Sequence, residues 1–543
     1  MAAANRRTRS VFAVGVVLGL IAAAAAPSPA QSRTESREVP SDGGTYRRPL
    51  GNDPGTLDPA RIGDIYGRSV AQQIFDGLVQ FDHTLAIVPA LAKFWKASRD
   101  GLTWTFTLKP GLKFHHGREV TADDVVYSLT RLLDPRVKSS AADVFSVVRG
   151  AAEFRAGRAR QVSGFTALDR HTVQIVLSES LGPFVPVLAI GHAKIVPRDV
   201  AEAAGDAFGT RPVGTGPFRF VRWDRGKEIV LAANPDYFDG PPRLGRIVYR
   251  IFPGEQLDAM YEEFQRGRLD DTPLPNRDYR RIIADPRHVH LKRPTISLRF
   301  YGFNTRRKPF DDPRVRQAVN HAIDRSAIID DAFLGRYALA RGILPPGTLG
   351  FNPRVNGYAY DPQRSRDLLA RAGYPGGRGL PSIAIWSSVK HEGIVREHEL
   401  MARQLEAVGI EAEFHYLTEW PAFFKRLLDG EFPMFVLAWF ADVPDPDNFL
   451  SKLFHSESPR NFTRYTNPAV DRLLNGARSD RQVEKRVELY RRAEQMILDD
   501  AAILPVWHYT YERLFQPYVR SVEVSGLGDP YIPLRKVWLA PAR

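Results

Sequence analysis

The chain has 543 residues, 43% hydrophobic and 25% charged, which is typical of globular domains and excludes a disordered or collagen-like protein. It contains no cysteine, so disulfides, zinc–thiolate sites, iron–sulfur clusters, thiol nucleophiles and an acylated cysteine anchor are excluded. The net charge is +13, but the arginines are scattered among acidic residues rather than gathered into one patch, so we expect no nucleic-acid partner.

The N-terminus has the pattern of a secretory signal. Its first nine residues include three arginines and no acid, the apolar run Val11–Ala26 follows, and small residues precede a cut after Ala30. This run is shorter than the roughly 20 residues that a membrane-spanning helix needs, which favours a cleaved signal over an anchor. We predict a signal peptide over 1–30 and a flexible N-terminus over 31–44. The pair Arg6-Arg7 is also compatible with a twin-arginine export signal, so the sequence leaves both this route and the general secretory route open.

Strand and helix patterns alternate early in the mature chain. Apolar side chains and threonines alternate over Thr103–Lys109, which predicts a half-buried strand, and Thr172–Leu177 alternates in the same way. Between these strands, the spacing of apolar residues predicts a helix over Thr121–Leu133. Thr121 is the expected N-cap, and the acidic residues that follow it suit the positive end of the helix dipole.

Two further helices are predicted later in the chain. Asp312 is a suitable N-cap, and Pro313 occupies the first helical position, where a missing N–H costs nothing. The other helix is expected over Arg481–Ala502. Its apolar residues fall roughly on one side: Val483, Val487, Tyr490, Ile497 and Leu498.

The stretch from 382 to 440 alternates between strand and helix patterns. Strands are predicted over 382–387, 411–417 and 434–440, and helices over 395–408 and 420–428. The continuous apolar composition of the last strand is typical of a strand buried on both faces. Such alternation predicts an α/β fold with a parallel sheet covered by helices.

Carboxylates follow the last of these strands. Asp442, Asp445 and Asp447 lie shortly beyond Phe440. Because sheets of this kind bind ligands beyond the carboxyl ends of their strands, we expect the acidic cluster to lie at a ligand pocket. The interrupting prolines and a missing glycine argue against a calcium-binding loop.

No set of catalytic or metal-ligating residues stands out. His391 and His398 are about 10 Å apart along a helix, too far to share a metal ion, and we expect both to face solvent. The adjacent His115 and His116 would point apart on a strand. The proline after Gly214-Thr215-Gly216 argues against a dinucleotide-binding loop, and neither a phosphate-binding loop nor a nucleophile elbow occurs. We therefore expect no enzyme activity, no cofactor and no metal.

Six groups of residues carry a family resemblance. They are Thr56–Pro59; Phe114–Gly117 with Thr121–Val125; Val213–Phe218; Asn234–Tyr237; Phe303-Asn304 with Pro309–Asp311 and Arg314–Ala318; and Trp439–Phe449. In this order they resemble the family 5 extracellular solute-binding proteins, which include dipeptide-, oligopeptide- and nickel-binding components of ABC importers. The resemblance runs from about residue 45 to 540. His116 stands where the family usually has Asp, and Glu119 where a small residue or proline is common; we expect both to lie in a structural segment.

The resemblance implies a two-lobed periplasmic-binding-protein fold of type II, of the large kind with an extra subdomain and a hinge between the lobes. Lobe II would span 298–507. Lobe I would combine 45–82, an inserted subdomain over 83–208, the segment 209–297, and a C-terminal return over 508–543.

The resemblance also implies ligand-binding residues. In peptide-binding members, an Asp in the segment equivalent to Trp439–Asp442 pairs with the free amine of the ligand, which gives this role to Asp442. A carboxylate in a closing cleft can accept charge-assisted hydrogen bonds from an ammonium group, whereas the alternative is a capping or loop role. The other implied residues are Trp439, Phe440, Ala441, Asp64, Ile65, Tyr66, Gly214, Thr215 and Gly216. Core packing is the alternative for Trp439, and a purely structural turn is the alternative for the glycine-rich segment.

The implied function is that of a monomeric receptor in the periplasm. It would capture a peptide or similar amine-bearing solute by hinge closure and deliver it to an ABC permease and its ATPase in the inner membrane. A receptor for a nickel chelate, haem or an opine-like solute on the same scaffold is the alternative, with His115 and His508 as the histidines to inspect. An exported hydrolase or peptidase is a third hypothesis, which lacks an evident base, nucleophile or metal.

Overall fold

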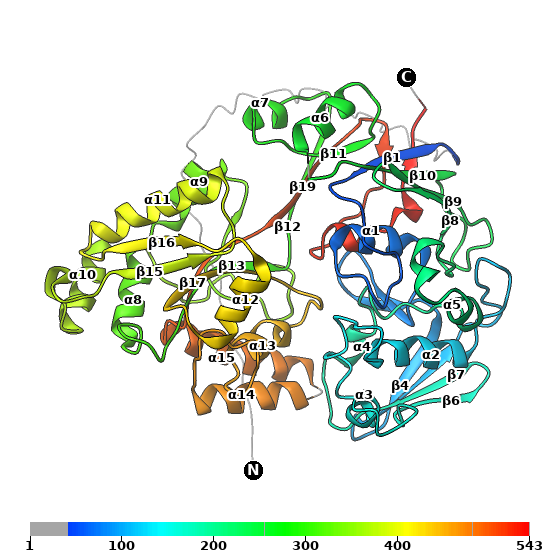
Figure 1. The fold of residues 1–543 in the computed structure, drawn as a ribbon, viewed down its shortest axis with the longest axis horizontal. Helices are drawn as coiled ribbons and strands as arrows, with labels where there is room; N and C mark the ends of the chain where they lie inside the picture. Colours follow the sequence, from blue (N-terminus) through cyan, green and yellow to red (C-terminus); the bar gives the residue numbers. More distant parts are fainter. Residues whose placement is uncertain (1–41, 255, 481, 542–543) are drawn as a thin grey trace, which may run out of the picture. The chain divides into compact units, whose positions relative to one another are not determined.

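A computed structural model describes residues 42–541 apart from positions 255 and 481 (Figure 1). The predicted signal peptide over 1–30 lies outside the described residues, as does most of the segment 31–44. Within the described part of the chain, none of the helices has both the length and the apolar character that crossing a bilayer requires.

The first sheet joins the start of the mature chain to strands far along the sequence. Its order is β1-β10-β9-β8, with β1 parallel to β10 and the other pairs antiparallel. Helix α1 shares a core with this sheet, through side chains such as Val70 and Ile74 beside Ile247 and Tyr249. The bounds are Thr45–Leu50 (β1), Ile65–Ile74 (α1), Phe218–Asp224 (β8), Glu228–Ala233 (β9) and Arg246–Ile251 (β10).

The chain between α1 and β8 forms a second antiparallel sheet with its own core. Its order is β4-β5-β7-β6, and β5 (Thr103–Leu108) and β7 (Thr172–Val176) confirm the two strands predicted here. The remaining bounds are Val79–Phe81 (β2), Ile87–Pro89 (β3), Ala92–Ala97 (β4), Ala122–Leu133 (α2), Ala151–Arg155 (α3), Phe165–Asp169 (β6), Phe184–Val187 (α4) and Arg198–Ala204 (α5).

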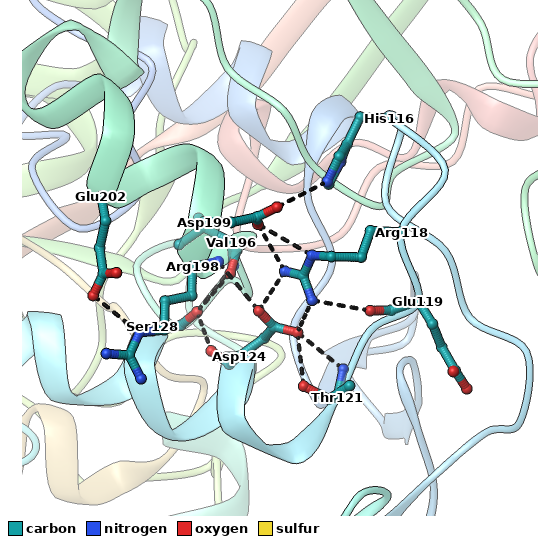
Figure 2. Close-up of polar contacts among 10 residues, drawn as sticks. All are labelled: His116, Arg118, Glu119, Thr121, Asp124, Ser128, Val196, Arg198, Asp199 and Glu202. Carbon is teal, nitrogen blue, oxygen red and sulfur yellow. Dashed lines mark hydrogen bonds and ion pairs between the residues drawn. The ribbon is translucent and has the colours of Figure 1, made fainter.

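Helix α2 begins where predicted, and a network centred on Asp124 holds its first turn (Figure 2). The Asp124 carboxylate accepts hydrogen bonds from the backbone N–H and the hydroxyl of Thr121, both at 3.0 Å. It also pairs with Arg118 at 2.6 Å. Arg118 and His116 reach Asp199 in α5 at 2.9 and 3.5 Å. The segment around His116 therefore ties α5 to the start of α2, which agrees with the structural role expected for it.

A six-stranded mixed sheet organises residues 297–508. Its order is β14-β18-β13-β17-β15-β16; β15 is parallel to β16 and β17, whereas β13 is antiparallel to β17 and β18. The prediction of a parallel sheet is correct for the stretch from 382 to 440. It is incomplete for the six-stranded sheet, because β13 and β18 come from outside that stretch. The strand bounds are Ser297–Phe303 (β13), Ala338–Leu339 (β14), Ile383–Ser387 (β15), Ala412–Tyr416 (β16), Met434–Phe440 (β17) and Ile503–His508 (β18).

Helices cover both faces of this sheet, and the strand side chains alternate between two cores. On β13, Leu298 and Phe300 belong to one core, and Tyr301 and Phe303 belong to the other. Helices α12 to α15 contribute to the first core and α8 to α11 to the second (Figure 1). The helix bounds are Pro313–Ala322 (α8), Arg325–Phe333 (α9), Pro362–Arg371 (α10), Glu392–Glu406 (α11), Trp420–Asp429 (α12), Leu450–Phe454 (α13), Pro468–Ser479 (α14) and Val483–Asp499 (α15).

Several predicted details in this sheet hold and others do not. The Asp312 side chain caps α8 by accepting a hydrogen bond from the Arg314 N–H at 2.8 Å, as expected. Val483 is 48% exposed and lies off the apolar side of α15. Strand β17 is buried from Met434 to Leu437, but Phe440 is 56% exposed, so the expectation of two buried faces is wrong for the end of this strand.

A three-stranded antiparallel sheet has the order β11-β19-β12 (Figure 1). It contains the two strands through which the chain enters and leaves the six-stranded sheet, and these strands join the two halves of the chain, residues 297–508 and the rest. Strand β12 leads directly into β13, and β19 directly follows β18. This ladder has the connectivity expected of a hinge, while the predicted domain boundaries stay predictions. The bounds here are Leu257–Gln265 (α6), Asp271–Pro273 (β11), Tyr279–Ile283 (α7), Val289–Pro294 (β12), Thr510–Phe515 (β19), Val519–Arg520 (β20) and Trp538–Leu539 (β21).

Candidate ligand-binding site

Asp442 lies at the wall of a cavity just beyond the end of β17. The chain leaves the sheet after Ala441, whose N–H donates to the Ile296 carbonyl at 2.9 Å. The Asp442 side chain is 44% exposed and lines a cavity of about 140 Å³. The other lining residues are Ile62, Gly63, Arg68, Ser140, Ala141, Val144, Ile190 and His192. Asp442 thus lines this cavity, whereas Asp445 and Asp447 line a different one of about 320 Å³. That the acidic cluster lies at a ligand pocket stays a prediction.

Two basic side chains accompany Asp442 in this cavity, which we call the Asp442 cavity. Arg68 Nη1 lies 3.9 Å from Asp442 Oδ1. His192 is buried, and its Nε2 lies 3.0 Å from the Ile62 carbonyl oxygen and 3.1 Å from the Ser140 hydroxyl. Burial lowers the pKa of His192, and the charge of Arg68 lowers it further, so this imidazole is neutral near pH 7. The cavity thus presents one anion and one cation.

A second and larger cavity, of about 250 Å³, lies on the face of the sheet that α9 and α11 cover. Aromatic rings form one wall. Tyr337 stacks on Trp507 at 5.0 Å between ring centroids, and Tyr509 lies 5.1 Å from Tyr337. The exposed ring of Phe440 extends this row, at 5.1 Å from Tyr509. We call this space the aromatic cavity; it offers apolar contact to a ligand side chain.

A buried ion pair lies at the edge of the aromatic cavity. Arg299 lines it, and its Nη2 lies 2.9 Å from Glu397 Oε2, while the Tyr301 hydroxyl donates to Glu397 Oε1 at 2.6 Å. Both charged side chains are at most 3% exposed. Burial lowers the pKa of Arg299, but Glu397, Tyr509 and Tyr301 together outweigh burial and leave that pKa above its ordinary value. The guanidinium is therefore charged and already neutralised within the protein.

The remaining residues predicted on β17 make contacts within the chain. Trp439 is half-buried against a core, and its indole N–H donates to the Asn448 carbonyl at 2.9 Å. Ala438 lines the aromatic cavity, and Asp442 lines the other cavity four residues later. At about 3.3 Å per extended residue, roughly 13 Å of chain separates the two positions.

The predicted segment Asp64–Tyr66 lies beside the Asp442 cavity rather than in its wall. Asp64 caps α1, because its carboxylate accepts from the Gly67 N–H at 2.6 Å. Ile65 and Tyr66 line a different cavity, of about 140 Å³, together with Arg513. The residues that face Asp442 come from either side of this segment, at Ile62, Gly63 and Arg68.

The segment Gly214–Gly216 makes structural contacts. A Cβ on Gly214 would lie 2.0 Å from the carbonyl oxygen of Ile74, so only glycine fits there. The buried Thr215 hydroxyl donates to Asp76 at 2.8 Å. The linings of the Asp442 cavity and the aromatic cavity do not include these residues.

The acidic cluster beyond β17 separates into different roles. Asp445 is buried and pairs with Arg486 at 2.8 Å. Asp447 accepts a hydrogen bond from the Tyr490 hydroxyl at 3.3 Å. Asp442 is the member of this cluster that lines the cavity shared with Arg68.

The structure corrects one expectation about histidines. His398 is 2% exposed, so the prediction that it faces solvent is wrong; its ring stacks on Phe414 at 4.2 Å, and burial lowers its pKa to about 3. His391 is exposed and caps α11, which begins three residues earlier than predicted. His115 and His508 are held on backbone carbonyls of Gly216 and Ser297, at 3.0 and 2.7 Å. Among the described residues, no group of three or more His, Asp or Glu side chains could hold a metal ion.

The sequence carries no local signal for four residues that line these cavities or pair beside them, which are Arg68, His192, Arg299 and Glu397. Arg68 lies two residues beyond the predicted segment Asp64–Tyr66, but the arginines are so scattered that the sequence does not indicate which one lines a cavity. The position of Glu397 on its helix gives no signal either, because its partner, Arg299, lies on the distant strand β13.

The comparisons with known proteins agree with this architecture. The profile of the bacterial extracellular solute-binding proteins, family 5 (middle region), matches residues 86–461. The chain is 31% identical to the dipeptide-binding protein of Escherichia coli, over 84% of this chain and 87% of that protein. It is also 31% identical to Heme-binding protein A of Haemophilus influenzae, over 96% and 97%. The structure resembles the periplasmic binding protein DppA of Helicobacter pylori in complex with the peptide STSA, with a TM-score of 0.75, 27% identity, and coverage of 92% and 99%.

The fold is therefore that of the two-lobed periplasmic binding proteins, as predicted. The chain belongs to the family 5 extracellular solute-binding proteins. This result confirms the resemblance found in the sequence, and the relatives are binding proteins rather than enzymes by their names.

Proposed function

We propose that this protein is the periplasmic receptor of an ABC importer and that it binds a peptide whose free amine pairs with Asp442. The position of Asp442 carries the proposal. Its carboxylate lines a cavity beyond β17, and among the described residues no hydrogen bond occupies its oxygens. A carboxylate in this state can accept charge-assisted hydrogen bonds from an ammonium group. The names of the relatives, which include a dipeptide-binding protein, support a peptide as the solute.

The spacing of the two cavities supports a short ligand. An extended residue spans about 3.3–3.6 Å, so a dipeptide or tripeptide is roughly 7–11 Å long. The chain between Ala438 and Asp442 is roughly 13 Å long at 3.3 Å per residue, which is an upper limit on the distance between these positions and is comparable to the length of a tripeptide. With its amine at Asp442, such a peptide would extend toward the aromatic cavity, where Tyr509 and the exposed Phe440 could receive an apolar side chain.

The delivery step is part of the same proposal. The ladder of β12 and β19 is the candidate hinge, about which the halves of the chain close on the solute. The closed, loaded monomer would then dock on an inner-membrane permease with its ATPase, after export directed by the signal peptide over 1–30.

Isothermal titration calorimetry on the mature protein tests the amine anchor. Removing one partner of a buried charge pair costs about 2–5 kcal/mol, so Asp442→Asn should weaken peptide binding about 30- to 4,000-fold. Asp429→Asn is the matched control, because this aspartate has a similarly exposed side chain (46%) on the same sheet's helical cover. Unchanged affinity of Asp442→Asn for a di- or tripeptide that the wild type binds would refute the role of Asp442.

A flat aromatic solute such as haem is a second candidate. The row of rings formed by Phe440, Tyr509 and Tyr337 favours it, because planar ligands stack on aromatic side chains. Absorbance titration with haem separates the two candidates. Tight haem binding that survives Asp442→Asn but fails in Tyr509→Ala, with no peptide binding, would favour haem over a peptide.

A further inference from the structure

The Asp442 cavity contains a cation that the amine anchor alone does not explain. Arg68 Nη1 and Asp442 Oδ1 are 3.9 Å apart, beyond hydrogen-bond distance, and both side chains are partly exposed, at 22% and 44%. Within the described part of the chain, the Arg68 side chain donates one hydrogen bond, from Nε to the Asp64 carbonyl oxygen at 3.3 Å. The two terminal nitrogens of the guanidinium therefore remain available to a ligand.

The rest of the lining leaves these two charges as the strong recognition groups. His192 is neutral and is occupied by the Ile62 carbonyl and the Ser140 hydroxyl. Ile190 and Val144 are apolar, and an apolar wall strengthens the charge interactions of its neighbours. The volume of about 140 Å³ is several times the roughly 30 Å³ that one water occupies in the liquid. The cavity has room for a small charged head group.

An ammonium group alone is poorly matched to this arrangement. At Asp442 it would also face the guanidinium of Arg68, and two like charges a few ångströms apart repel. A head group that carries both charges is matched at both ends. Its ammonium would donate to Asp442, and its carboxylate would accept from the planar fork of Arg68.

We propose that the Asp442 cavity recognises a zwitterionic amino-acid head group, with an ammonium and a carboxylate on the same carbon, and that Arg68 selects it. This inference rests on the proposed amine anchor. The N-terminus of an ordinary peptide carries an uncharged carbonyl beside its amine, which gives Arg68 no counter-charge. The preferred solutes are therefore compounds joined to the head group through its side chain, such as γ-linked peptides.

Two isomeric dipeptides isolate the role of Arg68. In γ-Glu-Gly the amine and a carboxylate share one carbon, whereas in α-Glu-Gly they do not; formula and net charge are the same. We expect the wild type to bind γ-Glu-Gly at least tenfold more tightly in calorimetry. A hydrogen bond to a charged group is worth roughly 10- to 150-fold in affinity, so Arg68→Gln should weaken γ-Glu-Gly by this factor and leave α-Glu-Gly nearly unchanged.

The controls separate this inference from the proposed function. Arg61→Gln is the matched variant, because Arg61 lies on the same stretch of chain, with a side chain 34% exposed, and pairs with Asp206 instead of lining the cavity. Three outcomes would overturn the role of Arg68 and leave the amine anchor standing. The wild type could bind the two isomers equally, or Arg68→Gln could weaken both isomers equally. The third outcome is that the protein binds other peptides but neither isomer. Binding that is indifferent to Asp442→Asn would overturn the anchor, and this inference with it.

Discussion

Replacing Glu397 by glutamine tests the buried ion pair beside the aromatic cavity. The substitution keeps the size of the side chain and an oxygen that can accept the Tyr301 hydroxyl hydrogen bond. It removes the counter-charge of Arg299, which is 3% exposed. At 2.9 Å and an effective dielectric constant near 20, Coulomb's law gives an attraction of about 6 kcal/mol. Measured losses on breaking such pairs are about 3–5 kcal/mol, which is the expected fall in the free energy of unfolding.

Urea-induced unfolding of the mature protein provides the measurement. Trp507 lies 4.9 Å from the Arg299 guanidinium, so tryptophan fluorescence includes a reporter at the altered place. Glu399→Gln, two residues away with a side chain 58% exposed, should cost less than about 0.5 kcal/mol. The double variant Arg299→Met with Glu397→Gln should be more stable than Glu397→Gln alone, because it leaves no unpaired buried charge.

A loss below about 1 kcal/mol for Glu397→Gln would show that water or another group compensates Arg299. A double variant as unstable as the sum of the single ones would show that the two charges do not interact. Either result would refute the assignment of Glu397 as the internal counter-charge.

Two further predictions concern the stability of the six-stranded sheet and its covering helices. Burial raises the pKa of Glu494 to about 7 from 4.5, so the stability due to this group is present below pH 4.5 and is lost as the pH rises through 7. A tenfold change in proton affinity is worth about 1.4 kcal/mol. The free energy of unfolding of Glu494→Gln should therefore exceed that of the wild type by up to about 3 kcal/mol at pH 8 and by little at pH 4.5. Melting temperatures measured across this pH range check the difference. Gly302→Ala would place a Cβ 2.3 Å from the buried ring of Phe435, and overpacking of this kind costs about 1–3 kcal/mol; an unchanged melting temperature would show that the ring can move.

The local sequence pattern correctly predicts those helices and strands that are determined by interactions between residues close together in the chain. The capping side chain of Asp312 with Pro313, and the alternation from Thr103 to Leu108, predict their elements because the relevant interactions lie within a few residues. The end of β17 shows the limit of this reasoning. Its apolar composition predicts burial on both faces, but Phe440 lies at the rim of the aromatic cavity and is exposed. His398 shows the converse error, since β16 covers the side of α11 on which it lies.

Residue patterns alone predict the family, the α/β character and the strand after which an acidic ligand residue is expected. They could not decide among the carboxylates that follow this strand, because composition makes Asp442 and Asp445 alike. The folded chain distinguishes the two aspartates, because it gives them partners from distant parts of the sequence. Arg486 neutralises Asp445 in the interior, whereas Asp442 lies in a cavity opposite Arg68. Burial and charge pairing depend on neighbours in space, which is why the chemistry of each aspartate becomes visible only in the folded chain.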